Sequence, residues 1–295
     1  MFTPERKSEK IVVWRTNVRE QEPRHTLHIS DVHFDSAKCN REMLRRHLEE
    51  IKACEGQAFI YGDWFDVMGC FQDPRTKAAD IRPEYYVKGR EYLNAVIEDS
   101  VEFLRPYAKN IAFIGEGNHE SEIRRRRDVD ILAWMVRLLQ EMGSSVVRGA
   151  YTGWNEFVMQ YKPESSRNLL THYHHGYGGG AKRSKGMLDS QIAAFQYPDA
   201  DIIFRGHDHQ KFHDPSNVKY RYNDKFKIES MDTTHYIKTG SYKESATGTG
   251  GWEVQKGFMP SRLGGWFIDM QVTRLFKAED PSRPRVIDLT IREAV

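Results

Sequence analysis

The sequence predicts an α/β fold in which short buried strands alternate with helices. Apolar runs of strand length, such as residues 58–61, end at glycine or polar residues. Residues 40–53 lie between two such runs and carry apolar side chains at helical spacing, among them Leu44, Leu48 and Ile51. This strand–helix–strand order favours parallel strands joined by a crossover helix.

The same spacing rules give the remaining elements. Strands are expected at residues 11–14, 24–29, 110–115, 146–147, 157–161, 169–173 and 201–204, and helices at 84–107, 131–142 and 187–197. Residues 67–83 read as a loop, 219–266 as short strands mixed with turns, and 264–276 and 285–291 as closing strands. We find no repeat or linker and expect one domain, 1–295. Its motif core is 24–213, and 214–295 holds closing strands and a candidate lid. For 248–266, a lid, a dimer contact and simple packing all stay open.

Composition excludes several classes of protein. Of the 295 residues 39% are hydrophobic, which is enough for a sizeable core, and the formal net charge of +2 gives no strong general attraction to nucleic acid or anionic membranes. The three cysteines, Cys39, Cys54 and Cys70, form no Cys-x-x-Cys motif, as expected in a reducing compartment. No apolar run reaches the ~20 residues of a membrane helix, and residues 1–10 lack the apolar centre of a secretory signal. We therefore expect a cytoplasmic protein with no membrane partner.

Oxygen and imidazole side chains follow five of the expected strands. Seven of them are candidate metal ligands: Asp31, His33, Asp63, Asn118, His175, His207 and His209. Any one of these short motifs is common in turns, but α/β sheets build their sites at the carboxyl ends of strands. The set contains no thiolate and is too large for one tetrahedral zinc, so it suits two cations such as Mn²⁺, Fe²⁺/³⁺ or Zn²⁺. Two such ions roughly 3.5–4 Å apart serve displacement at phosphorus.

These motifs, in this order, resemble those of the calcineurin-like metallophosphoesterases. The matching segments are Asp31-x-His33, Gly62-Asp63-x-x-Asp66, Gly117-Asn118-His119-Glu120, His175-Gly176 and Gly206-His207-x-His209. Residues 82–85 and 174–176 also look like those of uncharacterised phage and bacterial members. The resemblance implies a four-layer α-β-β-α sandwich of two mixed sheets flanked by helices.

The resemblance also implies a role for each residue. Asp63 would bridge two divalent metal ions, with Mn²⁺ expected first and Fe or Zn²⁺ as alternatives. Asp31, His33 and His209 would complete one site, and Asn118, His175 and His207 the other. A hydroxide bridging the metals would attack phosphorus, and His119 would serve as general acid or transition-state donor. Asp66 and Glu120 would orient His119 and the ligands. His174 is the alternative to His175.

The resemblance implies a phosphoester substrate, and two enzyme classes stay open. A phosphodiesterase or nuclease acting on DNA or RNA is favoured by basic residues that could meet phosphates and by nearby aromatic side chains: Arg124 to Arg127, Lys182, Arg183, Lys185, Tyr85, Tyr86 and Tyr177. Among these, Arg124, Arg125 and Tyr177 are the candidate substrate contacts. The arginine run could equally be a solvated helix face. The alternative enzyme is a phosphomonoesterase acting on a nucleotide, a small metabolite or a phosphoprotein. A scaffold without activity is least favoured, because every ligand position is filled. The oligomeric state is left open.

Overall fold

The structure, a computed structural model, describes residues 1–67, 81–85, 90–178, 187–224, 227–244, 261–274 and 285–295. Its strands form two mixed sheets. The seven-stranded sheet has the order β1 (Thr3–Ser8), β2 (Ile11–Asn17), β7 (Thr152–Lys162), β8 (Ser165–His174), β9 (Ile202–Arg205), β11 (Ile228–Thr239), β10 (Lys211–Asn223). The six-stranded sheet has the order β13 (Arg285–Ala294), β12 (Gly265–Arg274), β3 (Arg24–Ile29), β4 (Gln57–Tyr61), β5 (Ile111–Gly115), β6 (Val147–Arg148).

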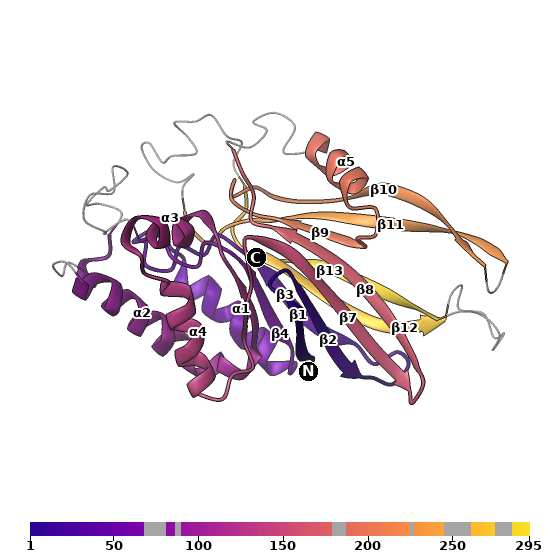
Figure 1. Cartoon of the computed structure of the whole chain (residues 1–295), viewed down its shortest axis with the longest axis horizontal. Coiled ribbons are helices and arrows are strands. Elements are labelled where there is room, and N and C mark those ends of the chain that lie inside the picture. The colour runs from indigo at the N-terminus through magenta and orange to yellow at the C-terminus, as the bar shows by residue number, and fades with distance from the viewer. Residues whose placement is uncertain (68–80, 86–89, 179–186, 225–226, 245–260, 275–284) are drawn as a thin grey trace.

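Helices cover the outer faces of both sheets (Figure 1). The helices α1 (Arg41–Ala53), α2 (Arg90–Leu104), α3 (Asn118–Arg127) and α4 (Ile131–Glu141) lie on the side of the six-stranded sheet, while α5 (Met187–Gln196) lies against β10 and β11. Two 3₁₀ helices, η2 (Pro83–Tyr85) and η3 (Arg105–Asn110), flank α2. The expected four-layer α-β-β-α sandwich is confirmed. In the part of the chain described, no helix is long and apolar enough to cross a membrane.

Side-chain alternation along the central strands creates the layers. In β4, Ala58 and Ile60 pack with the helices, whereas Phe59 and Tyr61 pack between the two sheets. A third and smaller core lies between α5 and the seven-stranded sheet, around Tyr236. The fully buried run at residues 58–61 thus reads as continuously apolar because both of its faces are covered.

The first helix shows why its sequence folds as expected. The side chain of Asn40 caps α1 by accepting a hydrogen bond from the backbone N–H of Met43 at 3.0 Å. Leu44, Leu48 and Ile51 are fully buried against the six-stranded sheet. The apolar stripe that predicts this helix is therefore the face by which it binds the sheet.

Several elements differ from the expectation. Residues 3–8 form the edge strand β1, and residues 211–223 and 228–239 pair as two long antiparallel strands instead of short strands with turns. Helix α2 starts at Arg90 rather than at residue 84, and residues 86–89 and 245–260 lie outside the described part. Residues 118–127 form α3, whose polar sequence carries no apolar stripe. Edge strands and exposed helices bury little, so they leave a weak periodic signal.

His28 supplies a test of how the inter-sheet core responds to pH. Its ring stacks on Phe204 at 4.5 Å between centroids and bonds Tyr61 Oη and Thr26 Oγ1, each at 2.8 Å. Burial lowers the pKa of His28 to about 3 from the ordinary 6.5. The unfolded chain therefore takes up a proton below about pH 6.5 while the folded chain does not, so stability falls as the pH falls.

We expect His28 to account for about 2 kcal/mol of stability lost between pH 7 and pH 5. His28→Phe keeps the stacking but loses the hydrogen bonds to Tyr61 and Thr26, so the variant should be less stable at pH 7. Because phenylalanine takes up no proton, the variant should lose less stability on going to pH 5. Urea unfolding at the two pH values measures the difference. An equal loss in the variant and the parent protein would contradict this account.

Candidate metal centre

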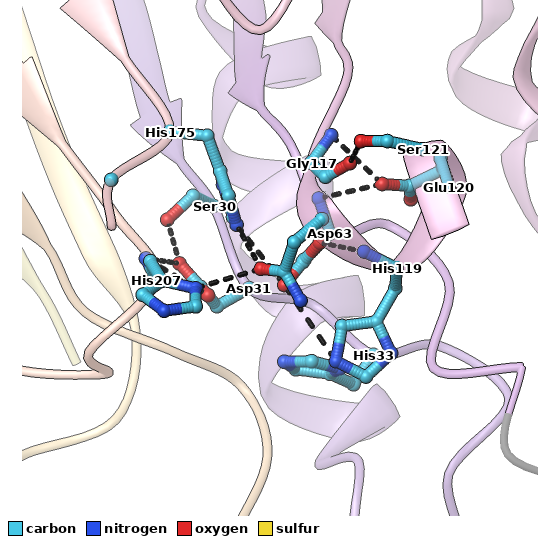
Figure 2. A network of polar contacts seen from close by, with 12 residues as sticks. Ser30, Asp31, His33, Asp63, Gly117, His119, Glu120, Ser121, His175 and His207 are labelled. Carbon is cyan, nitrogen blue, oxygen red and sulfur yellow. Dashed lines mark hydrogen bonds and ion pairs between the residues drawn. The ribbon is translucent and has the colours of Figure 1, made fainter. Parts of the chain in front are cut away.

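The predicted ligands come from the carboxyl ends of strands in both sheets. Strands β3, β4 and β5 run parallel, so the turns after them meet at one edge of the six-stranded sheet. The turns after β8 and β9, which are also parallel, reach the same place from the other sheet. Figure 2 shows His175, His207, Asp31 and Asp63 pointing toward one another, with His33 and His119 beside them.

One group of ligand atoms comes from Asp31, His33 and His209, all within 4.8 Å of one another. The Nε2 atoms of His33 and His209 are 3.1 Å apart, and His209 Nε2 is 3.6 Å from Asp31 Oδ1. Burial lowers the pKa of His33 to about 4, although Asp66 opposes the shift. Two ring nitrogens that face each other beside a carboxylate are an arrangement that a cation would hold together.

A second group comes from Asp63, His175 and His207, again within 4.8 Å of one another. His175 Nε2 lies 3.1 Å from Asp63 Oδ2 and 3.0 Å from Asn118 Oδ1, and His207 Nδ1 lies 2.7 Å from the same Asn118 oxygen. The structure therefore brings all seven predicted ligands into two adjoining groups. Their individual roles stay predictions.

The charges at the second group also fit a cation. Burial alone would raise the pKa of Asp63, but the imidazoles of His175 and His119 hold it well below its usual range. Burial would lower the pKa of His175, but Asp63 raises it to about 10. A proton on His175 thus balances the buried carboxylate, and a divalent ion bound by the same atoms would supply that positive charge instead.

The backbone at these ligands is held in a rarely populated conformation. Five of the seven have positive φ angles: Asp31 at 50°, His33 at 49°, Asp63 at 51°, His207 at 75° and His209 at 57°. Left-handed conformations cost non-glycine residues free energy and persist only where the surroundings enforce them. Their concentration here indicates that the turns are shaped for the geometry of the site.

Two glycines allow the turns to approach closely. A Cβ at Gly117 would collide with the side chain and backbone nitrogen of Asp63. A Cβ at Gly206 would lie 2.7 Å from Asp31 Oδ2. Both positions therefore need glycine because a ligand carboxylate occupies the space of a side chain.

Asp66 supports the first group and His119. Its Oδ1 lies 2.8 Å from His33 Nδ1 and 2.7 Å from Lys243 Nζ, and its backbone carbonyl is 2.6 Å from His119 Nδ1. His119 Nδ1 must carry the proton to donate to a carbonyl, which leaves Nε2 facing the centre, 3.9 Å from Asp63 Oδ2.

Glu120 fixes the loops instead of touching a ligand side chain. Its carboxylate accepts hydrogen bonds from the backbone N–H groups of Gly117 at 2.9 Å, Phe65 at 2.9 Å and Asp63 at 3.2 Å. Burial and the charge of Asp63 raise the pKa of Glu120 to about 8. Glu120 thus ties the turn after β4 to the start of α3.

Sequence reasoning missed two further supports of the site. Buried Asp35 accepts from the backbone N–H groups of Asp66 at 2.6 Å and Val67 at 2.8 Å. The loop after β11 brings Lys243 to Asp66, and its Ser241 donates to the Asp31 carbonyl at 2.8 Å. No local pattern marks either support, because β11 is largely polar and Asp35 lies outside the five motifs.

The neighbouring histidines lie apart from the two groups. His174 Nδ1 accepts from the Gly176 N–H at 2.9 Å, and its ring meets Tyr177 edge to face. His172 is buried and stacks on Tyr197 at 3.7 Å. His175, not His174, therefore lies with Asp63. Tyr177 is 79% exposed.

The arginine run binds carboxylates of its own surroundings. Arg124 contacts Glu116 at 2.8 Å, and Arg125 and Arg126 both pair with Glu122. These contacts compensate part of the positive charge on α3. Tyr85, also weighed as a substrate contact, is buried. The other residues weighed with them, Lys182, Arg183, Lys185 and Tyr86, lie outside the described residues.

Comparison with known proteins places this geometry in a family. Residues 24–211 match the family model of calcineurin-like phosphoesterases. The match covers more than half of the chain, so the chain belongs to the calcineurin-like phosphoesterase family. No curated protein matches the chain.

Solved structures of low similarity align with most of the chain. A metallophosphoesterase from Sphaerobacter thermophilus is 17% identical, covering 92% of this chain and 88% of its own, with a TM-score of 0.34. Vacuolar Protein Sorting 29 from Cryptosporidium parvum is 14% identical, covering 92% and 98%, with a TM-score of 0.36. A conserved uncharacterized protein from Streptococcus pneumoniae, described as a predicted phosphoesterase, is 10% identical, covering 92% and 99%, with a TM-score of 0.33. Similarity at this level carries no argument about function.

The tight turn at Gly117 gives a first test of the centre. Gly117→Ala should displace Asp63 and weaken Mn²⁺ binding by at least about tenfold, since losses of this size follow when ligand orientation is disturbed. Isothermal titration with Mn²⁺ measures the affinity. Gly143→Asn is the matched control, because a Cβ there meets nothing within 4 Å and asparagine tolerates its positive φ. Unchanged Mn²⁺ affinity in a folded Gly117→Ala protein would contradict the geometry.

Proposed function

We propose that this protein hydrolyses phosphoester bonds with two divalent cations held by the two ligand groups. One observation carries the proposal: carboxylate, amide and imidazole atoms from five strand ends meet in two adjoining clusters, one of which contains Asp63. When bound, such cations supply a nucleophilic water and withdraw charge from the phosphoryl oxygens. The oxygen and nitrogen donors suit Mn²⁺, Fe or Zn²⁺, with Mn²⁺ as the first ion to test.

The protein's own residues would orient the reaction. Asp63 belongs to the second group and would be the ligand that bridges the two cations, with its Oδ1 fixed by the His119 backbone N–H at 3.0 Å. His119 Nε2 faces the same space, because Nδ1 is committed to the Asp66 carbonyl. A protonated His119 would donate from Nε2 to the leaving oxygen as the bond to phosphorus breaks.

The contacts of the basic residues bear on the substrate class. A nuclease is favoured when free arginines face the nucleic acid, but Arg124, Arg125 and Arg126 are paired with carboxylates. We therefore propose a phosphomonoester as the substrate and keep a phosphodiester, including a nucleic acid, as the alternative to be assayed in parallel. Bis-p-nitrophenyl phosphate and p-nitrophenyl phosphate, each with Mn²⁺, separate diester from monoester hydrolysis.

Replacement of the bridging carboxylate tests the two-metal proposal. Asp63→Asn should lower kcat by at least about 10³-fold, because a neutral amide cannot balance two cations. The reaction rate with Mn²⁺ and a melting curve are the measurements, with exposed Asp199→Asn as the matched control. Full activity in a folded Asp63→Asn protein would contradict the proposal.

The role of His119 predicts a dependence on the leaving group. His119→Asn should lower kcat roughly 10²–10⁴-fold for phenyl phosphate. The loss should be smaller for p-nitrophenyl phosphate, whose leaving group needs no proton. Metal content by elemental analysis should match the parent protein, and His25→Asn serves as the control. An equal loss on both substrates would argue against proton donation by His119.

A further inference from the structure

The end of the β10–β11 hairpin extends beyond the strands that hold its base. Strand β9 pairs with β11 only from His235 to Lys238. From Ile228 to Thr234, β11 pairs only with β10 among the described residues. In Figure 1 this outer part, which we call the arm (217–223 and 228–234), runs to the right-hand end of the molecule. A two-stranded ribbon is marginally stable in water unless something covers it.

One face of the arm is largely apolar. Tyr220 lies opposite Met231, and Val218 and Tyr222 follow at alternate positions of the same strand, so the four side chains share a face. Their exposed fractions are 70% for Tyr220, 71% for Met231, 68% for Tyr222 and 54% for Val218. We call these four residues the arm face.

The arm face continues a surface that is buried at the base of the hairpin. Counting by twos along β11, Met231 shares its side with Ile237, which packs between the two sheets. His213, opposite Ile237, packs there against Trp266 with ring centroids 5.7 Å apart. The six-stranded sheet therefore covers this side of the hairpin at its base, whereas the arm face is exposed.

Three of the four charged residues in the described arm, Lys219, Arg221 and Asp232, lie on its opposite face. Lys219 lies opposite Asp232, and its ammonium reaches the carbonyls of Pro198 and Ala200. Arg221 pairs with Asp232 and with Asp201, the latter at 2.9 Å. Lys219 and Arg221 are thus bound within the chain, and Glu229, opposite Tyr222, is the charged side chain that lies on the side of the arm face. Residues 217–223 and 228–234 thus offer no unpaired cation to a nucleic acid or an anionic membrane, whereas exposed tyrosine and methionine are typical of the centre of protein interfaces.

We propose that the arm face binds the arm face of a second copy of this chain in a twofold dimer. Four side chains of this size and exposure present on the order of 500 Å² per chain. A standard interface buries roughly 800 Å² per partner, so the area suits a small self-complementary contact better than a permanent complex. A patch that meets its own copy closes the assembly at two chains. The expected dissociation constant is micromolar.

Sedimentation velocity from about 1 to 200 µM tests the proposal on the full chain. The mass should rise from the 34.5 kDa monomer toward the dimer. Tyr220→Glu places two like charges at the contact and should weaken dimerisation at least about tenfold, whereas Tyr220→Phe should preserve it. Trp134→Glu, at an exposed tryptophan on α4, is the matched control and should dimerise normally. Met231→Lys gives a second variant if Tyr220→Glu fails to fold.

A wild-type protein that stays monomeric at 200 µM overturns the proposal. So does a folded Tyr220→Glu or Met231→Lys protein that dimerises like the wild type, because the contact would then lie elsewhere or belong to another partner. Neither of these measurements depends on hydrolysis, so this proposal and the proposed function can fail separately.

Discussion

The centre depends on the position of Asp63, whose carboxylate and backbone tie four segments together. Its Oδ1 accepts from the backbone N–H of His119 in the first turn of α3, and its Oδ2 meets His175, which follows β8. Its backbone carbonyl accepts from the His33 N–H at 3.1 Å, and its own N–H donates to Glu120. These bonds require a left-handed backbone at Asp63 and a glycine at position 117. The turn after β4 therefore helps to fix the positions of His33, His175 and the start of α3.

Burial makes this arrangement costly unless positive charge is present. Asp31 and Asp63 are both almost completely inaccessible, and a buried carboxylate needs a counter-charge or several hydrogen bonds. The histidines around them supply part of that charge, but paired imidazole nitrogens, as in His33 and His209, gain little from facing each other. Divalent ions would neutralise the buried carboxylates and would also bind the imidazole nitrogens that face each other. The strain in the turns is then the cost of a geometry that exists before an ion binds.

The sequence predicts the parts of the molecule whose pattern is set by burial or by chemistry. Strands such as β4 are apolar on both faces, α1 carries an apolar stripe and a capping asparagine, and the ligand motifs stand at strand ends. The edge strand β1 and the long hairpin were not predicted, because exposed strands need no regular apolar pattern.

Single-residue contacts within the site are harder to foresee. The approach of Lys243 to Asp66 and the bonds of Asp35 join segments far apart in the sequence, and no local pattern announces them. The arginine run illustrates the converse. Four consecutive arginines suggest phosphate contacts, but the acidic partners of Arg124 and Arg125 become visible only once the helix and the strand before it are in place.

The most direct test of the central claim is anomalous diffraction from crystals of the protein reloaded with Mn²⁺. The account predicts two anomalous peaks roughly 3.5–4 Å apart, one beside Asp31, His33 and His209 and the other beside Asn118, His175 and His207, with the Asp63 carboxylate between them. A single peak, or peaks remote from Asp63, would contradict it.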